Sequence, residues 1–270
     1  MFKTTTLEAE LDKVASRVEL PNRKHYLVTG DSRIGNGMPT KFKRVSTMTS
    51  IVDKPALRYW YMNTALQHIK DNWEHVRKIK DEEPLDEALS SAKASPNKAR
   101  DSAGDYGTRA HALVQELADG TRTEAIPPEL RRVAVAWSDW INNADLEIVK
   151  TEQSFYWHRD GLSFAGTADL IARRGSKIYI VDYKTGGDDE KWKPYNDHAL
   201  QLGAYSLCLE YCTGIPVEEQ GAIVVKLPKY APQNDYTIKW GEVNELDYAR
   251  EAFLSAAFLK TWDGSETQWK

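Results

Sequence analysis

Two aspartates and a lysine have a spacing that suits cation-assisted chemistry. Asp182 and Lys184 are two residues apart in the apolar run 177–184, so on a strand their side chains point to the same face. Asp169 ends the segment Gly166-Thr-Ala-Asp169, and a hairpin between the two segments would set it beside Asp182. Adjacent carboxylates shift each other's pKa or recruit a cation. Because no cysteine or paired histidine accompanies them, these oxygen donors favour Mg²⁺ or Mn²⁺ over zinc.

Four further side chains could complete or support such a site. His111 lies in a predicted helix over residues 105–118, and Glu152 lies near the start of a predicted strand. Gln201 and Tyr205 are four residues apart on a later predicted helix and therefore share one face. Each has a purely structural alternative: a satisfied helix histidine, a solvated acid, or helix packing. For Asp182 and Lys184 the alternative is a surface ion pair on an edge strand.

The elements that must position these residues follow from hydrophobic periodicity. In the first half, apolar residues at helical spacing predict helices, with Ser95-Pro-Asn97 as a turn between two of them. In the second half, glycine-bounded apolar runs predict strands that alternate with helices, so we expect an α/β fold. The predicted helices cover 55–80, 87–94, 105–118, a segment after Pro128, 195–212 and 245–262. The predicted strands cover 148–157, 162–172, 177–184 and 222–227, the last paired with 236–240.

The composition is that of an ordinary globular protein. Of the 270 residues, 41% are hydrophobic and 28% are charged, which excludes a mainly disordered chain. Cys208 and Cys212 are the only cysteines, which excludes a disulfide framework and a four-cysteine metal or iron–sulfur site. The charged N-terminus lacks the apolar segment of a signal peptide, and no run of 18 apolar residues occurs. We therefore expect no membrane association and a cytoplasmic location.

The charge is distributed unevenly along the chain. Residues 1–100 hold 18 lysines and arginines against 13 acidic residues, whereas residues 101–270 hold 18 against 27. A basic front on an acidic chain suggests a polyanion as partner, although ordinary surface variation gives such a split as well. We therefore predict a basic, helical accessory region over 1–100 and a separate core over 101–270, with a polyanion as the candidate partner of the accessory region.

The motifs together resemble a known superfamily. The order GTADL, VDYKTG and QLGAY, with Asp182 standing 13 positions after Asp169, resembles the PD-(D/E)XK nuclease superfamily. The branch it is most similar to is that of the RecB-like and phage exonucleases, whose histidine motif the upstream segment GTRAHALVQEL resembles. The resemblance covers residues 105–212. It implies a restriction-endonuclease-like nuclease core over 101–270, a small mixed sheet flanked by helices in the order αβββαβ, with a helical N-terminal extension. With that resemblance, we expect the basic accessory region over 1–100 to contact DNA phosphates.

The resemblance also implies roles for the side chains. Asp169, Asp182, His111 and the backbone carbonyl of Tyr183 would hold Mg²⁺ or Mn²⁺. Lys184 would orient or deprotonate the attacking water and offset charge in the transition state. Gln201 and Tyr205 would hold the DNA strand or support the site, and Glu152 is a further acidic candidate. The implied reaction is metal-assisted in-line hydrolysis of a phosphodiester.

The sequence departs from some members of that branch and leaves alternatives open. The four iron–sulfur cysteines that some members carry are absent, and no nucleotide-binding glycine-rich loop accompanies the core. We expect a DNA exonuclease of phage or bacterial recombination, replication or repair, working with a helicase, a single-strand annealing protein or another recombination protein. A DNA-binding protein with little turnover and a structure-specific endonuclease remain alternatives. Cleavage polarity, strand preference and oligomeric state are left open.

Overall fold

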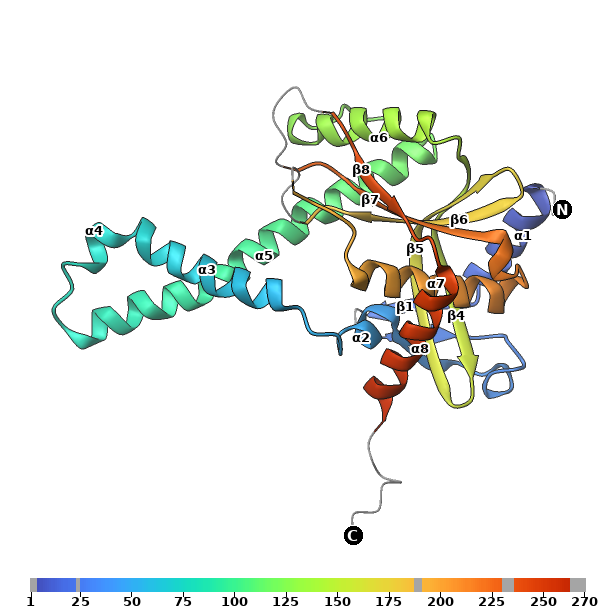
Figure 1. Cartoon of the computed structure of the whole chain (residues 1–270), viewed down its shortest axis with the longest axis horizontal. Coiled ribbons are helices and arrows are strands. Elements are labelled where there is room, and N and C mark those ends of the chain that lie inside the picture. The colour runs from blue at the N-terminus through green and yellow to red at the C-terminus, as the bar shows by residue number, and fades with distance from the viewer. Residues whose placement is uncertain (1–3, 23–24, 187–190, 230–235, 263–270) are drawn as a thin grey trace, which may run out of the picture. The chain divides into compact units, whose positions relative to one another are not determined.

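The protein divides into two compact units in the computed structural model (Figure 1). The core unit combines Met1–Val52 with Ala110–Lys270, and the helical unit is Asp53–Arg109. The structure describes residues 4–22, 25–186, 191–229 and 236–262. Among the helices of the described residues, none is long and apolar enough to cross a membrane.

A mixed sheet of eight strands forms the centre of the core unit. The strand order is β1-β2-β3-β5-β6-β7-β8, and β4 pairs with β5 outside this path. Every residue of β7 is buried, as expected for an apolar strand inside a sheet that is covered on both faces. The strands are β1 (Val18–Asn22), β2 (His25–Val28), β3 (Thr40–Arg44), β4 (Glu147–Arg159), β5 (Leu162–Arg174), β6 (Lys177–Lys184), β7 (Gln220–Lys226) and β8 (Lys239–Glu242).

The predicted α/β fold is confirmed. β4, β5 and β6 form an antiparallel meander, and α7 then connects β6 to the parallel strand β7. In Figure 1, α7 and α8 cover one face of this sheet, whereas α6 and the end of α5 lie on the other. The helices are α1 (Thr4–Ala15), α2 (Val45–Thr49), α3 (Pro55–Asp71), α4 (Trp73–Val76), α5 (Glu82–Ala118), α6 (Arg131–Asn143), α7 (Asn196–Thr213) and α8 (Leu246–Thr261).

Helix α7 packs closely against α8. A Cβ built on Gly203 of α7 would lie 2.6 Å from the carbonyl carbon and oxygen of Ala249 in α8. That position therefore has to be glycine if the two helices are to approach this closely. The helix ends at Gly214, whose left-handed φ of 76° is typical of a helix C-cap.

The first 52 residues differ from the sequence prediction. Instead of belonging to a helical extension, they group with the core unit and supply α1, β1, β2, β3 and α2. β3 runs parallel to β5 and pairs Lys43 with Phe164, and α1 buries Leu7 and Leu11 completely. These strands are short and partly polar, so their hydrophobic pattern is weak without the sheet that they extend.

The helical unit also differs in detail. The helix predicted over 55–80 is two helices, α3 and α4, and the turn predicted at residues 95–97 is wrong, because Pro96 lies inside α5. Proline removes the hydrogen bond that the Ala92 carbonyl would receive in a regular helix. The hydroxyl of Ser95 donates to that same carbonyl at 2.8 Å, which supplies a replacement and lets the helix continue.

The excess of basic residues predicted for the whole segment 1–100 is confined to its first 52 residues. Residues 1–52 hold 9 basic against 5 acidic residues, whereas residues 53–109 hold 10 of each. The basic excess of the first hundred residues therefore belongs to the segment that groups with the core unit.

Candidate active site

The β5–β6 pair brings the two aspartates together. Their register pairs Leu170 with Val181, so Asp169 and Asp182 occupy the next pair of positions. The backbone N–H of Tyr183 donates to Asp169 Oδ2 at 2.6 Å, which fixes the carboxylate of one strand against the backbone of the other. The adjacency expected from a hairpin is therefore present.

Gln201 connects the site to α7. Its Nε2 donates to Asp182 Oδ1 at 2.9 Å and to the Tyr205 hydroxyl at 2.8 Å, while its Oε1 accepts from Lys184 Nζ at 2.9 Å. Lys184 Nζ also lies 2.5 Å from Asp182 Oδ2. The four side chains form one network in which the uncharged amide holds the aspartate and the lysine at fixed positions.

The position of Tyr205 depends on a glycine in β5. A Cβ built on Gly166 would lie 2.5 Å from Cε1 of the Tyr205 ring and 3.2 Å from Cγ2 of Val45. The tyrosine ring also contacts Phe155 at a centroid distance of 5.5 Å. The first residue of the Gly166-Thr-Ala-Asp169 motif thus makes room for the tyrosine that supports Gln201.

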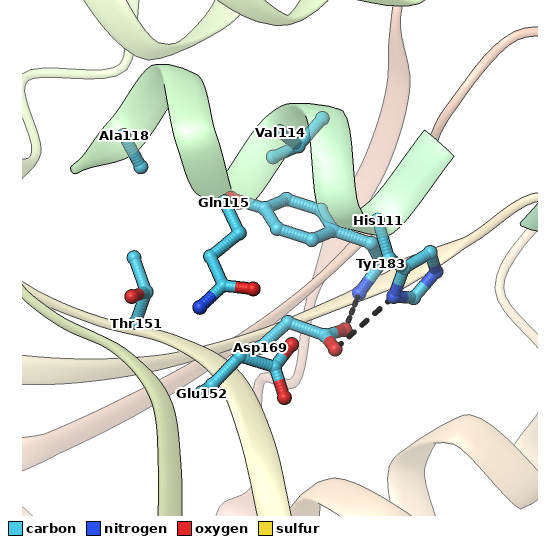
Figure 2. A pocket seen from close by; sticks show the side chains of 8 residues that line it. All are labelled: His111, Val114, Gln115, Ala118, Thr151, Glu152, Asp169 and Tyr183. Carbon is cyan, nitrogen blue, oxygen red and sulfur yellow. Dashed lines mark hydrogen bonds and ion pairs between the residues drawn. The ribbon is translucent and has the colours of Figure 1, made fainter. Parts of the chain in front are cut away.

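His111 approaches the site from α5. Its Nδ1 lies 3.2 Å from Asp169 Oδ1, and Figure 2 shows this contact beside the hydrogen bond from the Tyr183 amide. The Tyr183 ring points away from Gln201, toward α6, where its hydroxyl accepts a hydrogen bond from Trp137 Nε1 at 2.9 Å. Asp169 therefore binds a histidine and a backbone amide at the same time, one with each oxygen.

Glu152 lies close to Asp169 in a narrow pocket under α5 (Figure 2). Its φ of 45° is unusual for a residue other than glycine, and the β4–β5 register passes from Thr151 to Gln153 without pairing it. Although the side chain keeps contact with solvent, the packing around its carboxyl group and the charge of Asp169 raise the pKa of Glu152 to about 7. This backbone distortion turns a further acid toward the site.

The charges of the site act on each other. Burial raises the pKa of Asp182, Lys184 opposes this effect, and Asp169 adds to it. Burial lowers the pKa of His111, but the hydrogen bond and charge of Asp169 outweigh it, so the net shift is upward. For Lys184, burial is likewise outweighed by Asp182, and its pKa is raised. These shifts follow from acidic side chains that lie close together, beside Lys184 and His111.

The donor set suits a hard divalent cation. Two carboxylates stand side by side, and the buried Asp182 Oδ2 has no hydrogen-bond partner within the described residues, because Lys184 reaches it outside hydrogen-bond geometry. The described residues hold no ready-made group of three or more His, Cys, Asp or Glu side chains that could bind a metal. Both oxygens of Asp169 are engaged, one by His111 and the other by the backbone N–H of Tyr183.

The structure places the side chains of the candidate residues around Asp169 and Asp182, and Tyr183 contacts Asp169 through its backbone N–H. These candidates are His111, Glu152, Asp169, Asp182, Lys184, Gln201 and Tyr205. Sequence reasoning missed the supporting residues Trp137, Gln115, and the pair Thr151 and Asp119, whose side chains are hydrogen-bonded at 2.8 Å. A tryptophan or threonine in an amphipathic element has no sequence pattern that separates this role from ordinary packing.

The fold and the site define a nuclease superfamily. A family profile described as the PD-(D/E)XK nuclease superfamily matches residues 130–264, half of the chain. The chain therefore belongs to the PD-(D/E)XK nuclease superfamily. His111 lies outside the matched range.

Solved structures that match this chain do so at low sequence identity. The protein SSO0001 is 19% identical with a TM-score of 0.30, and the match covers 48% of this chain and 58% of that one. A putative exonuclease from Eubacterium rectale is 12% identical with a TM-score of 0.41, covering 56% and 63%. The alkaline exonuclease LHK-Exo from Laribacter hongkongensis is 15% identical with a TM-score of 0.30, covering 57% and 80%. This chain thus spans less than two thirds of the first two. A comparison with curated proteins gives no significant match.

Proposed function

We propose that the protein is a Mg²⁺- or Mn²⁺-dependent deoxyribonuclease and that it acts as an exonuclease. The observation that supports this proposal best is the Gln201 network, which fixes Asp182 and Lys184 together beside Asp169. A surface ion pair on an edge strand would need neither the second aspartate nor the helix that carries Gln201.

The residues have distinct roles in this proposal. Asp169, Asp182, His111 and the backbone carbonyl of Tyr183 would hold the divalent cation, which would make an attacking water more acidic and offset the charge of the phosphodiester. Lys184 orients the attacking water and offsets negative charge that develops on the phosphate.

Three further residues shape the site in this proposal. Gln201 keeps Lys184 and Asp182 in place, and Tyr205 keeps Gln201 in place. Glu152 adds a negative group that faces the site across Asp169, where it can receive a proton or a second cation.

DNA binding in this proposal draws on the N-terminal part of the chain. We keep the hypothesis that the accessory region predicted over 1–100 contacts DNA phosphates, and the basic excess of residues 1–52 points to that segment as the source of the contacts. Such contacts weaken as the salt concentration is raised. The affinity for DNA should therefore fall steeply between 50 and 200 mM salt, by orders of magnitude if several phosphates are contacted. A flat response would contradict this part of the proposal.

The biological setting that we propose is DNA recombination, replication or repair in a phage or a bacterium. These 270 residues carry no nucleotide-binding glycine-rich loop of the GxxxxGK[ST] type. A helicase, a single-strand annealing protein or another recombination protein is the partner class that fits.

The test is the digestion of one DNA in linear and in covalently closed circular form, with Mg²⁺, Mn²⁺ or EDTA. Metal-dependent loss of the linear form alone is the expected result, and it should disappear in Lys184→Ala. Lys177→Ala is the matched control, because Lys177 begins the same strand but is exposed and distant from the network.

Each other outcome has a definite meaning. Cleavage of the closed circle would replace the exonuclease proposal with an endonuclease. Retention of DNA in a gel shift without cleavage of either form would favour a binding protein with little turnover. Equal activity of Lys184→Ala and wild type would refute the role of the lysine.

A further inference from the structure

The helical unit has almost no core of its own. Of its described residues only Ala92, Pro96 and Gly107 are buried. Hydrogen bonds from Arg100 to the Tyr61 hydroxyl and between Ser91 and His68 connect its helices. Its large apolar side chains are exposed: Leu57, Tyr59, Trp60, Met62, Leu66, Trp73, Leu85 and Leu89. An apolar set of this size gathered on one unit is typical of a protein interface.

Helix α3 is apolar in sequence but exposed in the structure. From Tyr59 to Ile69 it carries no Asp, Glu, Lys or Arg, and its apolar residues are spread around the helix instead of along one stripe. A helix of this kind is normally covered on several sides. In this structure no residue of α3 is buried, and Met62 and Leu66 remain about half exposed, at 52% and 50%.

The first part of helix α5 is acidic and the following part is basic. Five acidic residues lie within 81–87, and Lys93, Lys98 and Arg100 follow within 93–100 without an acidic residue between them. Glu82, Asp86 and Lys93 are spaced by four and seven residues, so they share one side of the helix. Within the part of the chain that the structure describes, none of these three side chains makes an ion pair.

We propose that the helical unit is a self-association surface, on which α5 of one copy pairs antiparallel with α5 of a second copy around residue 90. In this pairing each acidic segment faces the other copy's basic segment. Asp86 lies opposite Lys93 of the other copy, on the side of α5 that also carries Glu82. The apolar residues Leu85 and Leu89, spaced as on a coiled-coil seam, then face the partner, and two α3 helices complete a four-helix arrangement.

Charge favours this partner over DNA. The helical unit carries 10 basic and 10 acidic residues, so it has no net charge with which to attract a polyanion. A two-fold axis places the same surface on both copies, and α5 is self-complementary only in the antiparallel orientation. In a parallel pair the acidic segments would face each other.

The experiment measures the mass of the full chain in solution by sedimentation over a range of concentrations. Wild type should reach twice the 30.7 kDa of one chain. The acid-to-base variant Glu82→Lys/Asp86→Lys and the base-to-acid variant Lys93→Glu should each raise the Kd of self-association at least about tenfold, because like charges then face each other.

Mixing the two variants is the decisive step. In a mixed pair, the lysines of the acid-to-base variant face the acidic residues of the base-to-acid variant at both ends of the contact, so the mixture should form a heterodimer. Recovery on mixing also shows that both variants are folded. A wild type that stays monomeric up to about 100 μM, where even weak specific pairs associate, would overturn the proposal. So would variants that still self-associate, or a mixture that stays monomeric.

Discussion

Replacing Gly166 by alanine tests whether β5 and α7 approach each other as closely as the structure shows. The added methyl would lie 2.5 Å from Cε1 of Tyr205, whereas carbon atoms at optimal contact are about 3.5–4.0 Å apart. The ring must therefore move by about 1 Å, and overpacking of this kind costs about 1–3 kcal/mol. Displacement also weakens the 2.8 Å hydrogen bond between Gln201 and Tyr205, adding about 1 kcal/mol.

The assay is thermal unfolding of Gly166→Ala, with Tyr205→Ala as the second member of a double-mutant cycle. A loss of about 2–4 kcal/mol lowers the melting temperature by roughly 4–16 °C for a domain of this size. Once the ring is removed, the new methyl meets Val45 but no tyrosine, so Gly166→Ala should then cost little.

The control is Gly104→Ala in α5, because a Cβ there meets nothing within 4 Å. Removing glycine from a helix interior should stabilise it by about 0.5–1 kcal/mol. An equal cost of Gly166→Ala with and without the Tyr205 ring would refute the close approach. If the proposed function is right, Gly166→Ala should also lower the turnover number by up to about 10²-fold, because a misplacement of 1 Å at a site can cost that much.

Three other perturbations have outcomes that follow directly from the structure. The hydrogen bonds from Arg33 hold the pKa of Asp31 well below its usual range, so Asp31 stabilises the fold above pH about 4 and loses this effect as the pH falls. Denaturant titrations should therefore show a stability difference between wild type and Asp31→Asn at pH 7 that shrinks toward pH 3. Gly203→Ala should lower the melting temperature by several degrees, because its Cβ meets the α8 backbone at 2.6 Å. Burial raises the pKa of both Cys208 and Cys212, so a disulfide reagent at pH 8 should modify them quickly only after unfolding; rapid labelling of the native protein would contradict their packing.

The sequence predicted the second half of the fold well, for physical reasons that its residues make plain. Strands β5 and β6 are apolar runs bounded by Gly161, Gly175 and Gly186, so both their type and their approximate ends follow from periodicity and turn chemistry. Their hairpin then places Asp169 beside Asp182 by register alone. The confirmed α/β fold rests on this part of the chain.

The first half shows the limit of such reasoning. The charged strand β3, Thr40 to Arg44, pairs with β2 on one side and with β5 on the other, and the contact with the distant β5 has no trace in its own sequence. The turn predicted at Ser95-Pro-Asn97 rests on the usual effect of proline, which is to end a helix. The hydrogen bond from the Ser95 hydroxyl to the Ala92 carbonyl, which compensates for the proline, can be found only from the structure.

Within the site, the sequence predicted which side chains meet but not how they are linked. Gln201 and Tyr205 share a helix face by spacing, yet the simultaneous contacts of Gln201 with Asp182 and Lys184 depend on the angle between α7 and the sheet. The positive φ that turns Glu152 toward Asp169 is likewise a product of the β4–β5 pairing. The catalytic roles themselves remain predictions.

The parallel pairing of β3 with β5 has a consequence for synthesis on the ribosome. Lys43 and Phe164 are about 120 residues apart in the chain, which takes roughly 6–24 s to translate at 5–20 residues per second. Until β4 and β5 emerge, α1 lacks the strand β4 on which it packs, and the small sheet β1-β2-β3 lacks its neighbour β5, so apolar side chains such as Leu7 and Phe42 are incompletely covered. The apolar side chains of residues 1–52 therefore stay partly exposed on the ribosome during this interval. A chaperone that binds apolar segments would have most time to bind them then.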